Sequence, residues 1–61
     1  MSVEMHNYLT YDVLRRAETK RVIRAETAFV ARRWLAANLN ADVTDIVALR
    51  VDENGKPIEF A

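Results

Sequence analysis

The sequence predicts an α+β fold in which one helix packs on one face of a small, mainly antiparallel sheet, with the element order β-β-α-β-β. Three features predict it: two β-rich runs around a polar stretch, an amphipathic central segment, and an Asn-Gly dipeptide between two further β-rich runs. At 61 residues, with no cysteine and one histidine, the chain is one domain, 1–61, that depends on its hydrophobic core.

The first two strands are expected at about 8–15 and 20–26. Alternation points Leu9, Tyr11 and Val13 to one side, and two apolar pairs bracket the polar stretch RRAETKR, as in a hairpin. The alternative is a single long helix over 12–39, followed by a C-terminal β-hairpin, because Ala, Glu, Arg, Lys and Leu favour helix. Residues 1–7 are expected to be frayed.

The run TAFVARRWLAANLN predicts the helix. Thr27 is the expected N-cap, and Asn38 or Asn40 stands near the C-terminal end. Helical spacing gathers one apolar side that should face the core, made by Ala28, Ala31, Leu35 and Leu39 and widened by Val30 and Trp34. Phe29 falls outside this side, and we expect it to pack under the incoming strand; the alternative is exposure for a partner.

The C-terminal hairpin is expected to have strands at about 44–51 and 57–60. Asn54-Gly55 accepts positive φ at both central positions of a tight turn. Pro57 has no N–H to donate, so the last strand should be a short edge strand.

Strand parity divides the third strand into two faces. Val47, Leu49 and Val51 share the face that we assign to the core. The opposite, open face of the sheet should then mix apolar side chains with arginines, as protein interfaces do; its expected members are Tyr8, Thr10, Leu14, Val22, Arg24, Ile46, Ala48 and Arg50.

Catalytic groups are scarce. His6 is the only histidine and Ser2 the only serine, both near the N-terminus, so a nucleophile with its base is not expected. The neighbouring acids, Asp42 with Asp45 and Asp52 with Glu53, are assigned to capping and turns. Gly55 is the only glycine, which excludes a glycine-rich phosphate loop. We predict that the chain is not an enzyme and has no cofactor or metal site.

The charges are sorted along the chain although they cancel overall. The stretch 15–33 holds seven basic and two acidic residues, which makes a nucleic-acid-binding module the alternative function. No apolar run approaches the roughly 20 residues of a membrane span, and MSVEMHNYL lacks the blocks of a signal peptide. We therefore expect a cytoplasmic protein.

The segment IRAETAFVARRWLAANLNADVTDIVALRV resembles the strand-helix-strand part of the small RNA-polymerase-inhibiting proteins of lytic podoviruses. The matching residues are Ile23, Ala25, Glu26, Thr27, Ala31 and Arg50. In that family an arginine on the last strand helps to contact the polymerase, so the resemblance implies this role for Arg50. It also implies a phage inhibitor of a bacterial host protein.

The sequence thus predicts a non-enzymatic module, encoded by a phage or mobile element, that binds and modulates a bacterial protein such as RNA polymerase. The expected partner-binding residues are Arg24, Arg50, Ile46, Tyr8, Phe29 and Arg33. A homodimer through the same face, or through the edge of the last strand, is a further alternative.

Overall fold

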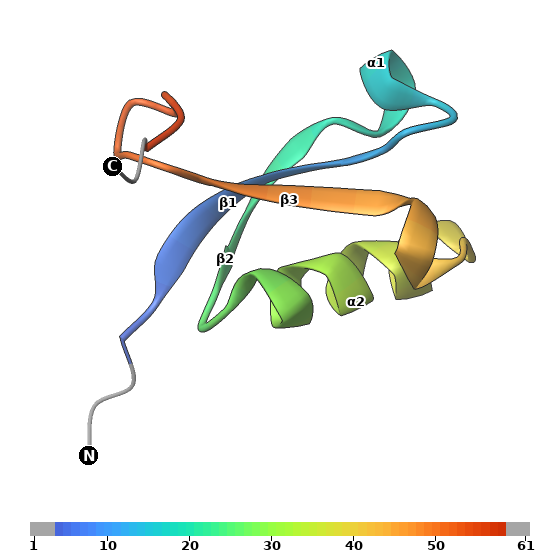
Figure 1. The fold of residues 1–61 in the computed structure, drawn as a ribbon, viewed down its shortest axis with the longest axis horizontal. Coiled ribbons are helices and arrows are strands. Elements are labelled where there is room, and N and C mark those ends of the chain that lie inside the picture. Colours follow the sequence, from blue (N-terminus) through green and yellow to red (C-terminus); the bar gives the residue numbers. More distant parts are fainter. Residues whose placement is uncertain (1–3, 59–61) are drawn as a thin grey trace.

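A computed structural model describes residues 4–58 as a helix packed on a three-stranded antiparallel sheet of strand order β2-β1-β3 (Figure 1). The elements in chain order are β1 (His6–Asp12), α1 (Arg16–Thr19), β2 (Arg21–Ala25), α2 (Ala28–Leu39), the 3-10 turn η1 (Val43–Asp45) and β3 (Ile46–Val51). The α+β class is confirmed. The long-helix alternative is wrong, because β2 pairs with β1 inside the segment that it would have occupied.

Strand β1 starts at His6, two residues before the predicted start. Of the segment expected to be frayed, residues 1–3 lie outside the described residues, and His6 and Asn7 already belong to the strand.

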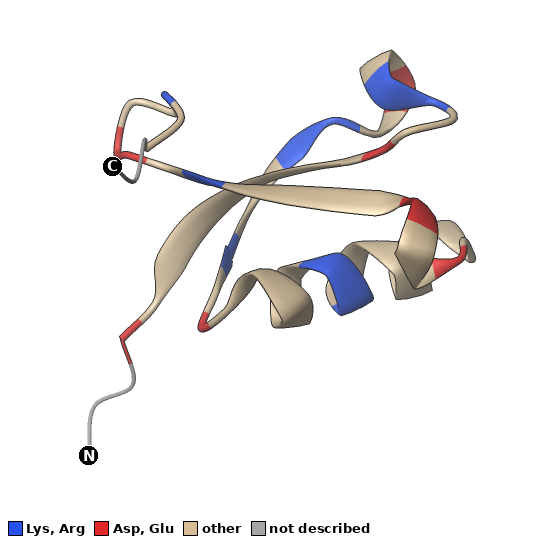
Figure 2. Cartoon of the chain, in the orientation of Figure 1, with Lys and Arg blue, Asp and Glu red and all other residues tan. Residues whose placement is uncertain are grey.

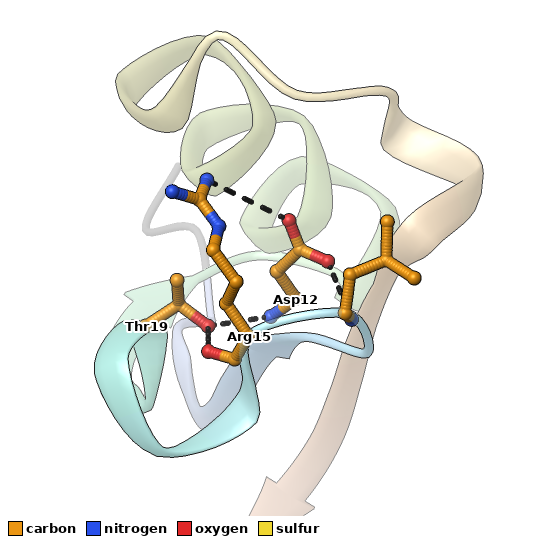
Figure 3. A network of polar contacts seen from close by, with 4 residues as sticks. Asp12, Arg15 and Thr19 are labelled. Carbon is orange, nitrogen blue, oxygen red and sulfur yellow. Dashed lines mark hydrogen bonds and ion pairs between the residues drawn. The ribbon is translucent and has the colours of Figure 1, made fainter.

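The polar stretch between β1 and β2 forms one helical turn, α1, which is fixed to the end of β1 by hydrogen bonds (Figure 3). The Thr19 hydroxyl accepts a hydrogen bond from the buried Asp12 N–H at 2.8 Å and donates one to the Arg15 carbonyl at 2.7 Å. Asp12 Oδ1 accepts from the Leu14 N–H at 2.9 Å. This network gives a defined shape to the connection between the first two strands.

Helix α2 begins and ends where its capping residues predict. The Thr27 hydroxyl accepts a hydrogen bond from the Val30 N–H, and Asn40 takes the left-handed conformation with φ 52°. Ala31 and Leu35 are fully buried against the sheet. Small alanines on this side let the helix approach the strands closely.

The helix covers the face of the sheet that we had expected to be open. Tyr8, Thr10 and Ile46 are buried there, and Ala48 packs against the same core. The assignment of faces was therefore wrong for β1 and β3, although the parity within each strand was right. Aliphatic residues occur on both sides of β3. Apolar character alone therefore does not show which side of the strand faces the helix.

Two aromatic residues of α2 also lie elsewhere than predicted. Trp34 was expected in the core but is 47% exposed, as is its neighbour Val30 on the same flank. Phe29 was expected to pack under the incoming strand but is 58% exposed. The side of α2 that meets the sheet is formed instead by Ala31 and Leu35, which are fully buried.

The outer edge of β3 is occupied at both ends. The Arg32 guanidinium donates hydrogen bonds to the Ile46 carbonyl at 3.0 Å and the Val43 carbonyl at 3.3 Å. At the other end the Ile58 N–H donates to the Arg50 carbonyl at 3.0 Å. Strand β3 starts at residue 46 because the two residues predicted before it belong to η1.

The C-terminal turn is held by Asp52, whose Oδ1 accepts from the N–H groups of Asn54 and Lys56, each at 2.9 Å. Gly55 takes a positive φ of 79°, but Asn54 does not, so the predicted pair of positive φ values is wrong. Of the predicted strand 57–60, Pro57 forms a single bridge with Val51, and residues 59 and 60 lie outside the described residues.

Candidate functional site

The candidate site is the face of the sheet turned away from α2, which we call the open face. Paired residues of antiparallel strands point to the same side, so the register defines its members. They are Asn7, Leu9 and Tyr11 of β1, Val22 and Arg24 of β2, and Val47, Leu49 and Val51 of β3. Figure 1 shows α2 on the opposite side of the strands.

The centre of the open face is aliphatic across all three strands. Leu9 pairs with Val22 on one side and with Leu49 on the other. Val22 is 55% and Leu49 43% exposed, so the row formed by these three residues meets solvent. An antiparallel sheet with one covered face usually carries polar residues on the other, which this row does not.

Polar and basic groups stand at both ends of the aliphatic row. Arg24 pairs with Asn7 on the open face at one end. At the other end the Arg16 guanidinium lies 4.7 Å from the centre of the Tyr11 ring, within the range of a cation–π contact. The open face therefore has an apolar centre and a rim that includes two arginines.

The six predicted partner-binding residues do not lie on one common surface of the structure. Arg24 lies on the open face, as expected. Tyr8 and Ile46 are buried beneath α2 and are not available to a partner in this fold. Arg50 is half-buried, and its pairing with Tyr8 places it on the α2 side of the sheet, so its predicted position on the open face was wrong.

The remaining two predicted residues lie on α2, away from the open face. Phe29 and Arg33 are exposed on this helix, with the Arg33 guanidinium 5.7 Å from the centre of the Phe29 ring. Exposure of Phe29 agrees with the alternative that the sequence left open. These two side chains form a smaller surface patch of their own.

Sequence reasoning missed Leu9, Tyr11, Val47 and Leu49 as surface residues, because their apolar side chains were taken for core. One signal could have found them. Ala48 has the small side chain that a helix rich in alanine needs in order to pack closely, which marks its parity on β3 as the helix side.

The basic stretch 15–33 does not gather on one face. Figure 2 shows its Lys and Arg residues spread over α1, β2 and α2. Arg21 pairs with Thr10 on the α2 side of the sheet, whereas Arg24 lies on the open face. Arg32 is engaged with backbone carbonyls at the edge of β3.

The acidic residues that were assigned to turns and caps have these roles in two cases. Asp42 Oδ1 accepts hydrogen bonds from the Thr44 N–H at 3.0 Å and the Thr44 hydroxyl at 2.8 Å. These two donors, the backbone N–H first, lower the pKa of the Asp42 carboxyl. Asp52 holds the C-terminal turn. Within residues 4–58, no group of three or more His, Cys, Asp and Glu side chains could hold a metal ion.

Comparison with protein-family models, with curated proteins and with solved structures finds no match to this chain. In the part of the chain that the structure describes, no helix combines the length and the apolar character needed to cross a membrane.

Proposed function

We propose that this chain is a non-enzymatic protein-binding module that binds and modulates a bacterial protein in the cytoplasm through its open face. The observation that carries the proposal is the exposed aliphatic row of Leu9, Val22 and Leu49 at the centre of the sheet face that α2 does not cover. Burial of such side chains favours association, by about 1.5–3 kcal/mol for a fully exposed one that becomes fully buried.

The rim indicates the chemistry of the partner. An apolar centre with arginines at the margin is a common composition of protein interfaces, in which arginine pairs with carboxylates. Arg24 and Arg16 would each meet such a group at opposite ends of the row. The partner should therefore present an apolar surface with acidic residues at its border.

Bacterial RNA polymerase is the partner that we propose to test first, because the segment around α2 resembles podoviral inhibitors of this enzyme. The residue that would make the contact differs from the one that the resemblance implied. We assign the contact to Arg24, which lies on the open face, because Arg50 lies on the α2 side of the sheet.

The test compares wild-type protein with Leu49→Glu, which puts a charge at the centre of the open face. The matched control is Leu14→Glu, an equal change at a side chain that is 75% exposed and follows the end of β1. Circular dichroism melts should show that both variants fold. Binding to purified RNA polymerase is then measured by calorimetry, and stoichiometric capture from bacterial lysate is compared for the three proteins.

We expect Leu49→Glu to weaken binding by about 30-fold or more and Leu14→Glu to change it little. Capture of a different single protein that depends on Leu49 in the same way would support the open face and reject the polymerase. Equal binding by both variants would refute a role for the open face. Gel shifts that weaken steeply with salt and ignore Leu49→Glu would favour the nucleic-acid alternative.

A further inference from the structure

The outer edge of β2 carries backbone groups that no other described strand pairs with. Along β1 the N–H groups alternate in direction: that of Asp12 points to the β2 side and that of Val13 to Asp45 on the β3 side. The alternate residues of β1 that include Asp12 therefore direct their backbone N–H and C=O groups toward β2, and their partners there include Ile23. The N–H and C=O groups of Val22 and Arg24 consequently point outward.

A shallow groove of about 410 Å³ lies between this edge and α2. Its lining residues include four large apolar ones with exposures of 40% to 55%, namely Met5, Val22, Val30 and Trp34. An unpaired strand edge beside an apolar groove is a surface that can accept another strand. The edge of β3 differs, since Arg32 and Ile58 bond to its carbonyls.

We propose that a second copy of this chain pairs with this edge, β2 against β2, in an antiparallel two-fold dimer centred on Ile23. Val22 of one copy then stands opposite Arg24 of the other, and the outward backbone groups of both residues form hydrogen bonds. One residue beyond each end of β2, Lys20 of one copy stands opposite Glu26 of the other. These opposite charges meet twice, once at each end of the junction.

Charge selects this register over its neighbours. A dimer centred on Val22 would place Lys20 opposite Arg24, and one centred on Arg24 would place the two Arg24 side chains opposite each other. Like charges directly opposite on paired strands are destabilising, whereas opposite charges are stabilising. Of these three centres, only the one at Ile23 places each basic residue of β2 and Lys20 opposite an acidic or apolar residue. The strand is thus complementary to itself in one alignment.

The groove supports the same arrangement. A two-fold axis perpendicular to the plane of the sheet keeps both α2 helices on the same face of the joined sheet. Both grooves then open toward the axis, and Trp34 and Val30 of each copy border the junction. A buried tryptophan contributes a large apolar area to an interface. The proposed dimer therefore covers the side chains that α2 leaves exposed on this flank.

The oligomeric state tests the proposal directly. Sedimentation equilibrium should show a monomer-dimer equilibrium for the wild-type protein, and Trp34, the only tryptophan, should become less accessible to acrylamide as the protein concentration rises. Lys20→Glu and Glu26→Lys should each raise the dimer dissociation constant about tenfold, since each variant creates two like-charge pairs. The double variant restores both pairs and should recover most of the affinity.

Cross-linking tests the register, because the chain has no cysteine of its own. A mixture of Val22→Cys and Arg24→Cys proteins should give mainly the mixed disulfide, since paired residues about 5.5 Å apart at Cα fit disulfide geometry. A protein that stays monomeric at millimolar concentration, a double charge variant no tighter than the single ones, or a predominance of Val22→Cys homodimers would overturn the proposal. The measured quantities are self-association and cross-linking without any partner protein, so failure of the dimer is distinguishable from failure of the proposed function, even though Val22 and Arg24 also belong to the open face.

Discussion

Replacement of Thr19 by valine tests the corner between β1 and β2. The two side chains have nearly the same shape, so the change removes little more than the hydroxyl. The Arg15 carbonyl keeps a hydrogen bond from the Thr19 N–H at 3.1 Å, but the buried Asp12 N–H loses its acceptor. A buried donor left without a partner costs about 1–3 kcal/mol. This is a large fraction of the roughly 3–9 kcal/mol expected for a domain of 61 residues.

The assay is urea and thermal unfolding followed by circular dichroism. Thr19→Val should lower the midpoint of thermal unfolding by about 5–20 °C, at the sensitivity typical of a domain this small. Thr44→Val is the matched control, because the Thr44 hydroxyl bonds to Asp42 in an exposed position. It should cost less than about 0.5 kcal/mol. Equal stability of the two variants would refute the idea that the hydroxyl of Thr19 satisfies a donor that water cannot reach.

The core and the caps give three more predictions. Leu35→Ala should cost about 2–5 kcal/mol by equilibrium unfolding and Trp34→Ala clearly less, because Leu35 is fully buried and Trp34 is 47% exposed; equal losses would contradict this. Asn40→Gly should leave stability nearly unchanged while Asn40→Val lowers it by about 1 kcal/mol or more, since φ is 52° there. The Asp42 carboxyl should titrate by NMR below its ordinary pKa of 3.8, so that its stabilising contribution is present above 3.8 and is lost as the pH falls through the lower folded pKa; an Asp42→Asn variant that keeps the same acid dependence would argue against it.

Local backbone chemistry made the elements predictable. Thr27 and Asn40 mark the two ends of α2 because a side-chain acceptor and a left-handed residue satisfy the helix termini wherever they occur. The first hairpin followed from apolar pairs on each side of a polar stretch. Neither inference needs knowledge of what the element packs against.

The faces of the sheet could not be read in the same way. Both sides of β3 carry aliphatic residues, with Ile46 on one side and Leu49 on the other, so alternation within this strand does not show which side faces the helix. The larger aliphatic set was assigned to the core, but α2 meets the sheet through alanines and so selects the parity with Ala48. Trp34 and Phe29 are exposed on α2, against the prediction for both. The sequence therefore placed Arg24 on the open face as the structure does, but assigned Tyr8, Ile46 and Arg50 to that face wrongly.

The difference between the two edges of the sheet limits how far the sheet can grow. Hydrogen bonds from Arg32 and Ile58 occupy carbonyls of β3, so a strand arriving there must displace a guanidinium and a turn before it can pair. The edge of β2 is thus the only one of the two that pairs without rearrangement. A chain with two open edges could stack without end into a fibre, as flat sheets do. The self-pairing that we propose for β2 would use up the accessible edge of both molecules and so would stop at a dimer.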